Sequence, residues 1–218
     1  MSPAPPTTVH LVRHGETDWN LTQRWQGHTD IPLNPRGLSQ AEAVARRLQR
    51  EAVRPVLIAS SDLSRALRTA EAIGALLGAP VETHLGLREI DVGRWQGRTR
   101  AETEALEPGV LARIDAGEDL PRGGAERFAD LVARCAAVFD SLLERAPGSS
   151  LIVVTHGGSV RALLRHALGA GRFDYPVLPI GNTSLTTLEG SPGAWRLERL
   201  DDRAHLGEGA PRADVEGA

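Results

Sequence analysis

Apolar residues along the chain form short continuous runs separated by longer stretches with helical spacing. The runs at 8–12, 56–59 and 150–154 contain no regular alternation of polar residues, which indicates parallel strands buried on both faces. Weaker patterns predict three further strands, the last two at or near the sheet edge: 81–83, 183–188 and 195–200. Strands that alternate with helices indicate an α/β fold, a three-layer α/β/α sandwich around a mostly parallel central sheet.

The helical stretches have starting signals of their own. Ser39-Gln40-Ala41-Glu42 and Thr99 to Glu102 have the form of capping boxes, and Ser60-Ser61-Asp62 has the form of a capping cluster. Together with the apolar spacing, these signals predict one or two short helices within 99–115 and longer helices at 39–50, 63–77, 125–145 and 160–168.

The two ends of the chain differ in composition from the middle. The Pro-rich start predicts a disordered leader at 1–7, and the polar, Gly- and Ala-rich end predicts a disordered tail at 201–218. Residues 8–200 are expected to form one domain with a helical excursion at about 98–124.

Charged side chains follow several of the predicted strands. Arg13-His14-Gly15 ends the first strand, and His156-Gly157 follows the strand at 150–154. Arg65 falls in the first turn of a helix, where the helix dipole favours anions over cations, so an anion bound beside it would explain its place. Glu89 lies in the loop after the strand at 81–83. Because ligands bind at the carboxyl ends of strands in open α/β sheets, these side chains predict one anion site.

Each of these residues taken alone has a simpler explanation. Arg13 and His14 would then be two polar residues at the surface end of a strand, Arg65 a solvated side chain, and Glu89 a salt-bridge partner. Two strands that each deliver a histidine followed by glycine make a coincidence less plausible.

The composition excludes several classes of protein. The chain has 218 residues and no lysine, so all 25 basic residues are arginine, and Schiff-base enzymes and Walker A nucleotide loops are excluded. A net charge of −3 argues against a general nucleic-acid binder. The single cysteine, Cys135, allows no intrachain disulfide, and we find neither a signal peptide nor an apolar run long enough to cross a membrane. We therefore expect a cytoplasmic protein, with a homodimer as one possible assembly.

Five motifs, in this order, resemble the histidine phosphatase superfamily, which has the phosphoglycerate mutase-like fold. They are LVRHGETDWN, WQGHTDIPLNPRGLSQA, SSDLSRALRTAE, LREIDVGRWQG and VVTHGG, and the resemblance covers nearly all of residues 9–190.

The resemblance implies a role for each matching residue. His14 would attack phosphorus and carry the phosphoryl group, and Glu89 would give a proton to the leaving oxygen. Arg13, Arg65 and His156 would surround the phosphate with positive charge and donors. The substrate-binding set would be Asn20, Gln26, Gly27 and Gly157. We further expect the carbonyl of Gly15 to fix the tautomer of His14, and neither a metal ion nor a cofactor is implied.

The motif after Glu89 favours the phosphatase branch. The mutases of this superfamily continue from their catalytic glutamate with Arg-His-Tyr-Gly, whereas this chain has Ile90-Asp91-Val92-Gly93. The expected ligand is a small phosphorylated metabolite, whose identity the sequence leaves open. Arg94 or Arg122 could contact a second carboxylate. Three tryptophans could line the outer pocket or serve as plain core: Trp19, Trp25 and Trp95.

The favoured function is thus a metal-independent phosphomonoesterase that works through a phosphohistidine. The alternatives are a cofactor-dependent phosphoglycerate mutase and, less consistent with the complete motif set, a phospholigand-binding protein without turnover. A metal hydrolase that uses His14 and His156 as ligands is the weakest of them.

Overall fold

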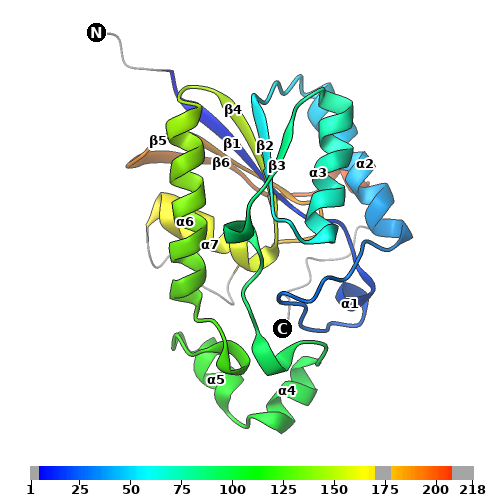
Figure 1. The fold of residues 1–218 in the computed structure, drawn as a ribbon, viewed down its shortest axis with the longest axis vertical. Helices are drawn as coiled ribbons and strands as arrows, with labels where there is room; N and C mark the ends of the chain where they lie inside the picture. Colours follow the sequence, from blue (N-terminus) through cyan, green and yellow to red (C-terminus); the bar gives the residue numbers. More distant parts are fainter. Residues whose placement is uncertain (1–4, 170–177, 208–218) are drawn as a thin grey trace.

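A six-stranded sheet forms the centre of the computed structural model, which describes residues 5–169 and 178–207 (Figure 1). The strand order is β3-β2-β4-β1-β5-β6. The strand bounds are Thr7–Arg13 (β1), Leu57–Ser60 (β2), Val81–Thr83 (β3), Ser150–Thr155 (β4), Leu185–Ser191 (β5) and Ala194–Asp202 (β6). β3, β2, β4 and β1 pair in parallel, and β5 runs antiparallel to β1 and β6. The mostly parallel sheet is confirmed, with β6 at its edge.

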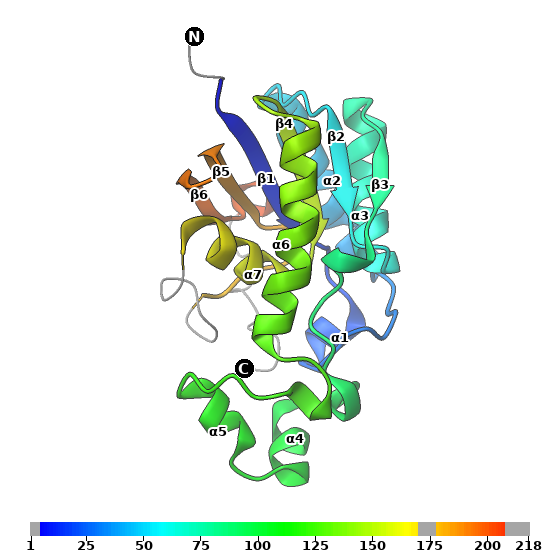
Figure 2. The same ribbon diagram turned by 60° about the vertical axis from the view of Figure 1, so that its left-hand side comes forward.

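Helices cover both faces of the sheet, as Figures 1 and 2 show from two directions. One layer consists of α2 (Pro35–Arg50) and α3 (Ser64–Leu77), and the other of α6 (Phe128–Arg145) and α7 (Gly157–Leu168). Two short helices, α4 (Arg100–Leu106) and α5 (Val110–Asp115), lie beyond the carboxyl ends of the parallel strands, within the predicted excursion. The remaining short elements are α1 (Asp18–Leu21), η1 (Leu85–Leu87), η2 (Gly93–Trp95), η3 (Arg122–Gly124) and η4 (Ala204–Leu206).

Alternate residues of the central strands enter different cores. On β4, Leu151 and Val153 pack with α6 and α7, whereas Ile152 and Val154 pack with α2 and α3. This explains the continuous apolar runs in the sequence, because both faces of the strand are buried. A third, smaller cluster joins the excursion to the loops: Trp25, Val92, Trp95, Leu111 and Ile114.

The helix α2 begins earlier than its predicted capping box. The Asn34 side chain accepts a hydrogen bond from the N–H of Gly37 at 2.8 Å, and Pro35 occupies the first helical position. Asn followed by Pro is a strong signal for the start of a helix. The Asn side chain accepts one of the first N–H groups, which have no partner within the helix, and Pro has no N–H to satisfy. Ser39 therefore lies inside the helix, and its hydroxyl donates to the carbonyl of Pro35. The capping box of Thr99 and Glu102 at the start of α4 is confirmed.

The other three long helices also depart from their predicted starts. α3 begins at Ser64, whose N–H donates to the carboxylate of Asp30 from a distant loop, and not at the predicted capping cluster. α6 begins at Phe128, where the carboxylate of Asp119 accepts the N–H groups of Phe128 and Ala129, and not at the predicted residue 125. α7 begins directly at Gly157, so His156 is its N-cap residue.

Both predicted chain ends need correction. β1 already includes Thr7, and β6 extends to Asp202 and is followed by η4. Arg47 holds this last part by two hydrogen bonds to Asp202, at 2.8 and 2.6 Å, so order continues past residue 200. The remainder of the predicted leader and tail, 1–4 and 208–218, lies outside the described residues.

Candidate active site

The register of β1 on β4 brings the two site histidines together. Arg13 pairs with Thr155 across the two parallel strands, and His14 and His156 each follow directly. Their ring centroids lie 5.1 Å apart, and both side chains are fully buried. Two separate motifs of the sequence thus meet at one point because adjacent parallel strands end at the same edge.

The carbonyl of Gly15 sets the tautomer of His14. His14 Nδ1 lies 2.7 Å from this oxygen, which can only accept a hydrogen bond. Nδ1 must therefore carry the proton, and the neutral ring presents its lone pair on Nε2. The structure agrees with the contact expected from the sequence.

Gly15 is required by a close approach of two backbones. A Cβ built on Gly15 would lie 2.4 Å from the carbonyl oxygen of Gly37, in the first turn of α2. One on Gly37 would lie 2.1 Å from the carbonyl oxygen of Glu16. Close packing of α2 against the loop that follows β1 explains these two glycines.

Two buried arginines flank the histidines. Arg13 is 1% exposed and donates from Nη1 to the carbonyl of Ile180 at 2.6 Å. Arg65, fully buried in the first turn of α3, donates to the carbonyls of Thr29 at 2.8 Å and Gly27 at 2.9 Å. Both guanidinium groups lie close enough to His156 to lower its pKa. Arg65 therefore lies at the site, not in solvent.

His156 contributes a donor and not a full positive charge. Burial, followed by the charges of Arg65, His14 and Arg13, holds the pKa of His156 well below its usual value. A bound phosphate dianion would act in the opposite direction. The sequence did not identify the hydrogen-bond partner of its Nε2, the hydroxyl of Ser61 at 2.9 Å.

Glu89 reaches the same place from an irregular loop. Its carboxylate is 2% exposed and accepts the N–H of Ile90 at 2.8 Å and the N–H of Gly158, in the first turn of α7, at 2.9 Å. A Cβ on Gly158 would lie 2.2 Å from Glu89 Oε1, whereas one on Gly157 would make ordinary contact with Arg13. The sterically demanding glycine is thus Gly158, which the sequence analysis did not single out.

Asn20 and Gln26 are oriented by one threonine. Thr17 Oγ1 lies 3.0 Å from Asn20 Oδ1 and 3.1 Å from Gln26 Oε1. Asn182, another residue that the sequence analysis missed, donates to Asn20 Oδ1 at 3.3 Å and to the carbonyl of His14 at 3.0 Å. With its oxygen engaged, Asn20 presents its NH₂ group, which has no hydrogen-bond partner among the described residues.

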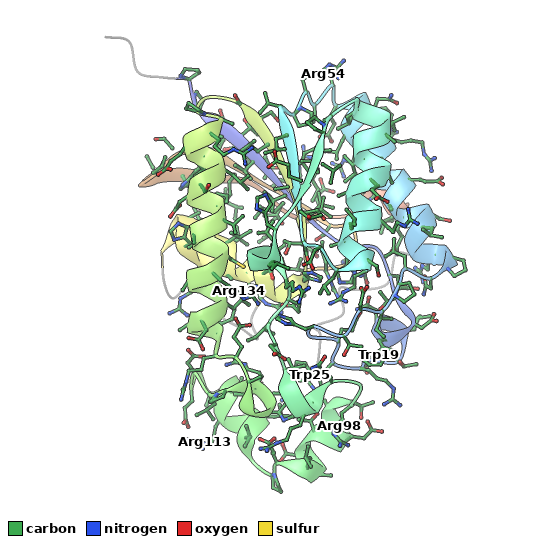
Figure 3. The ribbon with its side chains drawn as sticks, viewed as in Figure 1. Trp19, Trp25, Arg54, Arg98, Arg113 and Arg134 are labelled. Carbon is green, nitrogen blue, oxygen red and sulfur yellow. The ribbon has the colours of Figure 1, made fainter. Side chains whose placement is uncertain are left out.

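A cavity extends from Glu89 and Gly158 toward the excursion. Gln26 and Gly27 belong to its rim, and the tilted pair Trp25 and Trp95 forms part of its wall, with ring centroids 5.5 Å apart. Trp25 lies between the sheet and the excursion in Figure 3, and the Trp95 N–H donates to Glu107. Both tryptophans therefore serve as core and as cavity wall.

The structure places the three remaining residues whose roles the sequence left open in different environments. Arg122 lines the cavity and is 7% exposed. Arg94 is largely exposed and pairs with Glu107 at 2.7 Å, outside the cavity lining. Trp19 lies over Gly97, where an added Cβ would approach its ring to 3.2 Å.

Among residues 5–169 and 178–207, no group of three or more His, Cys, Asp or Glu side chains is arranged to hold a metal ion. Within the same ranges, every helix is too short or too polar to cross a membrane.

Comparison with known proteins identifies the family. A sequence profile of the histidine phosphatase superfamily (branch 1) matches residues 9–203. The glucosyl-3-phosphoglycerate phosphatase of Mycolicibacterium vanbaalenii is 38% identical over 208 residues, covering 86% of this chain and 91% of that protein. The probable phosphoglycerate mutase GpmB of Yersinia pestis strain Pestoides F is 34% identical over 207 residues, covering 91% and 94%.

A solved structure agrees with the sequence relatives. A mycobacterial glucosyl-3-phosphoglycerate phosphatase in complex with VO3 has a TM-score of 0.82 and 32% identity, covering 90% of this chain and 99% of that one. The predicted fold and the predicted family are both confirmed. The chain belongs to branch 1 of the histidine phosphatase superfamily.

Proposed function

We propose that this protein hydrolyses phosphate monoesters of small metabolites without a metal ion, through a phosphohistidine on His14. The observation that carries the proposal is the Gly15 carbonyl on His14 Nδ1, at 2.7 Å. It directs the Nε2 lone pair of a buried imidazole into a site that also holds Arg13 and Arg65. A nucleophile fixed beside two guanidinium groups suits attack on a phosphoryl group.

The reaction takes place in two displacements. In the first, His14 Nε2 forms a bond to phosphorus while the ester P–O bond breaks, and Glu89 donates a proton to the leaving oxygen. In the second, water attacks phosphorus, Glu89 takes its proton, and the P–N bond breaks to release phosphate. Arg13, Arg65 and the N–H of His156 hold the phosphoryl oxygens through both steps.

The cavity beyond Glu89 is suited to the organic part of the substrate. Its wall is largely apolar, and two buried arginines, Arg122 and Arg161, belong to its lining together with Asp115. Arg122 also pairs with Asp119 at 3.0 Å. Apolar surface with positive charge fits a short organic group that carries a carboxylate. We therefore propose phosphorylated organic acids as the preferred substrates; the mycobacterial relative, by its name, acts on a phosphoglycerate derivative.

A phosphoglycerate mutase is the second candidate, because a relative at 34% identity has that name. Ile90-Asp91-Val92-Gly93 occupies the place of the mutase motif, which favours hydrolysis. Cytoplasmic location and a homodimer remain predictions from the sequence.

The test combines three measurements on the full chain. We expect hydrolysis of p-nitrophenyl phosphate in the presence of a chelator, an acid-labile phosphoenzyme, and a higher kcat/KM for 3-phosphoglycerate than for glycerol 3-phosphate. A lack of hydrolysis of all three esters would contradict the proposal. Exchange between phosphoglycerates that outpaces phosphate release and depends on a bisphosphorylated primer would favour the mutase.

A further inference from the structure

The segment that carries Glu89, residues 85–91, is held by side chains from elements on either side of it. Arg134 Nη1, from α6, donates to the carbonyls of Gly86 at 3.0 Å and Arg88 at 2.6 Å, and Nη2 donates to the carbonyl of Glu89 at 2.7 Å. One guanidinium group thus fixes three carbonyls of a four-residue stretch. Figure 3 shows Arg134 beside this segment.

Arg134 is itself fixed by a carboxylate that holds the far end of the segment. It forms a bidentate pair with Glu126, at 2.7 and 2.8 Å. The same carboxylate accepts the N–H of Asp91 at 2.9 Å, and the backbone of Glu126 donates to the carbonyl of Asp91 at 3.1 Å. The Arg134–Glu126 pair therefore spans the segment on both sides of Glu89.

Other side chains support the same stretch. His28 Nε2 contacts the Glu89 carbonyl at 2.8 Å, Ser159 donates to the carbonyl of Arg88 at 2.8 Å, and Thr155 donates to that of Leu87 at 2.7 Å. The 3-10 turn η1 is short, so these contacts determine the path of the backbone at Glu89.

We propose that Arg134 is a positioning residue for Glu89, which holds the carboxylate at the place where it protonates the leaving oxygen. This inference rests on the proposed phosphatase function. Proton transfer requires a donor within hydrogen-bond reach of the leaving atom, and a displacement of about 1 Å can cost about 10²-fold in rate. Arg134 acts on Glu89 through the backbone carbonyls that it holds.

Two esters separate this role from a general structural one. p-Nitrophenolate leaves without much help from an acid, whereas the alkoxide of glycerol 3-phosphate needs a proton as it leaves. Displacement of Glu89 should therefore lower kcat/KM, which reports the first displacement, more for the alkyl ester than for the aryl ester. Damage to the whole site would slow both equally.

The main variant is Arg134→Gln, with Arg145→Gln as its matched control. Arg145 lies at the C-terminal end of the same helix, and it pairs at the surface with Glu82 of β3, at 2.9 Å. We expect Arg134→Gln to lower kcat/KM about 10²-fold for glycerol 3-phosphate and less than about 5-fold for p-nitrophenyl phosphate. The ratio kcat/KM reports the first displacement, whereas kcat also contains the hydrolysis of the phosphohistidine, which both esters share and which also uses Glu89. Arg145→Gln should leave both values within about twofold.

A double-mutant comparison tests whether the effect passes through Glu89. In a Glu89→Gln background, Arg134→Gln should slow the alkyl ester by less than about threefold, because the proton donor is already absent. Equal losses on the two esters, or an undiminished effect in this background, would overturn the inference.

His28→Ala provides a second variant in case Arg134→Gln fails to fold. His28 is half-buried and contacts the Glu89 carbonyl from the other side, so we expect the same dependence on leaving group with a smaller loss, about 5-fold to 10-fold. An equal loss on both esters would again contradict the inference. A wild-type chain that hydrolyses neither ester and forms no phosphoenzyme would instead contradict the proposed function.

Discussion

Two halves of the site are built in different ways. The strand-end half consists of Arg13, His14, Arg65 and His156, which come from the ends of β1 and β4 and the start of α3. The loop half consists of residues 85–127, where short helices and turns replace strands. In the first half, the ladder of β1 on β4 sets the distance between the histidines. In the second, side-chain hydrogen bonds such as those of Arg134 set the path of the backbone.

The difference indicates that the two halves have different functions. Every substrate carries the same phosphoryl group, so the residues that bind it can be held in one fixed arrangement by the rigid edge of the sheet. Leaving groups vary between substrates, and the loop half contributes both Glu89 and most of the cavity wall. Loops can vary without disturbing the sheet, so substrate preference is expected to reside there.

The largest expected effect is that of His14→Asn in the strand-end half. Removal of the nucleophile eliminates the first displacement, so hydrolysis should fall on the order of 10⁴-fold or more for every ester. The acid-labile phosphoenzyme should disappear as well. Steady-state rates for p-nitrophenyl phosphate and glycerol 3-phosphate measure this, with near-UV circular dichroism to check the fold. Losses that differ strongly between the two esters would contradict the assignment of phosphoryl transfer to the strand-end half.

The strand-end half was largely predictable from the sequence. Apolar runs located β1 and β4, and the polar residues after them identified His14 and His156. The parallel pairing that brings them together follows from the α/β pattern. Arg65 was identified because a cation in the first turn of a helix needs an explanation.

The side chains that hold the two halves in place could not be predicted in this way. Arg134 lies in the middle of an amphipathic helix, where an arginine signals only a polar face, and its carbonyl partners are distant in sequence. The same applies to Ser61 and Asn182, whose contacts with the site depend on tertiary packing. Hydrogen bonds to backbone carbonyls leave no motif, because every residue has a carbonyl.

A stability difference between the halves is the next expected effect. Ile114→Ala removes a buried side chain from the small cluster of the excursion, which is separate from the two sheet cores. The lost packing should lower the free energy of local opening by about 2–4 kcal/mol. Hydrogen exchange should therefore become faster for amides of α4 and α5 and stay unchanged for β1 and β4.

The matched variant for this prediction is Ile73→Ala. Ile73 is fully buried between α3 and the sheet, so its truncation should lower protection throughout the molecule and reduce the midpoint of thermal unfolding. If Ile114→Ala reduces the protection of the strands to the same extent, the two halves unfold as one unit.

Ser61→Ala should produce a smaller effect, equal for all esters. Ser61 accepts the N–H of Leu63 at 3.3 Å, so its own proton can go to His156 Nε2, which leaves an N–H on Nδ1 for the phosphoryl group. Loss of this contact should lower kcat/KM about 10-fold for both the aryl and the alkyl ester. Ser61→Thr retains the hydroxyl and should recover part of the activity. If Ser61→Ala slowed only the alkyl ester, Ser61 would instead support the protonation of the leaving oxygen by Glu89.

The smallest effect concerns acid stability, which involves His10, the histidine within β1. His10 is buried against Thr187, and burial, followed by the charge of Arg199, lowers its pKa to about 4. The unfolded chain, with a pKa near 6.5, therefore binds a proton between pH 6.5 and 4 that the folded chain does not. Stability must fall as the pH falls through this window, by up to about 1.4 kcal/mol per pH unit from His10.

His10→Gln removes this titration and should flatten the pH dependence of urea unfolding measured between pH 7 and 4.5. Part of the slope should remain, because burial and the charge of Arg47 also lower the pKa of His205 to about 4. Identical slopes for the variant and the wild type would show that His10 does not bind a proton on unfolding. Because His10 lies on β1, the strand that leads to His14, this loss of stability should affect the strand-end half, and the protection of β1 amides should fall with it.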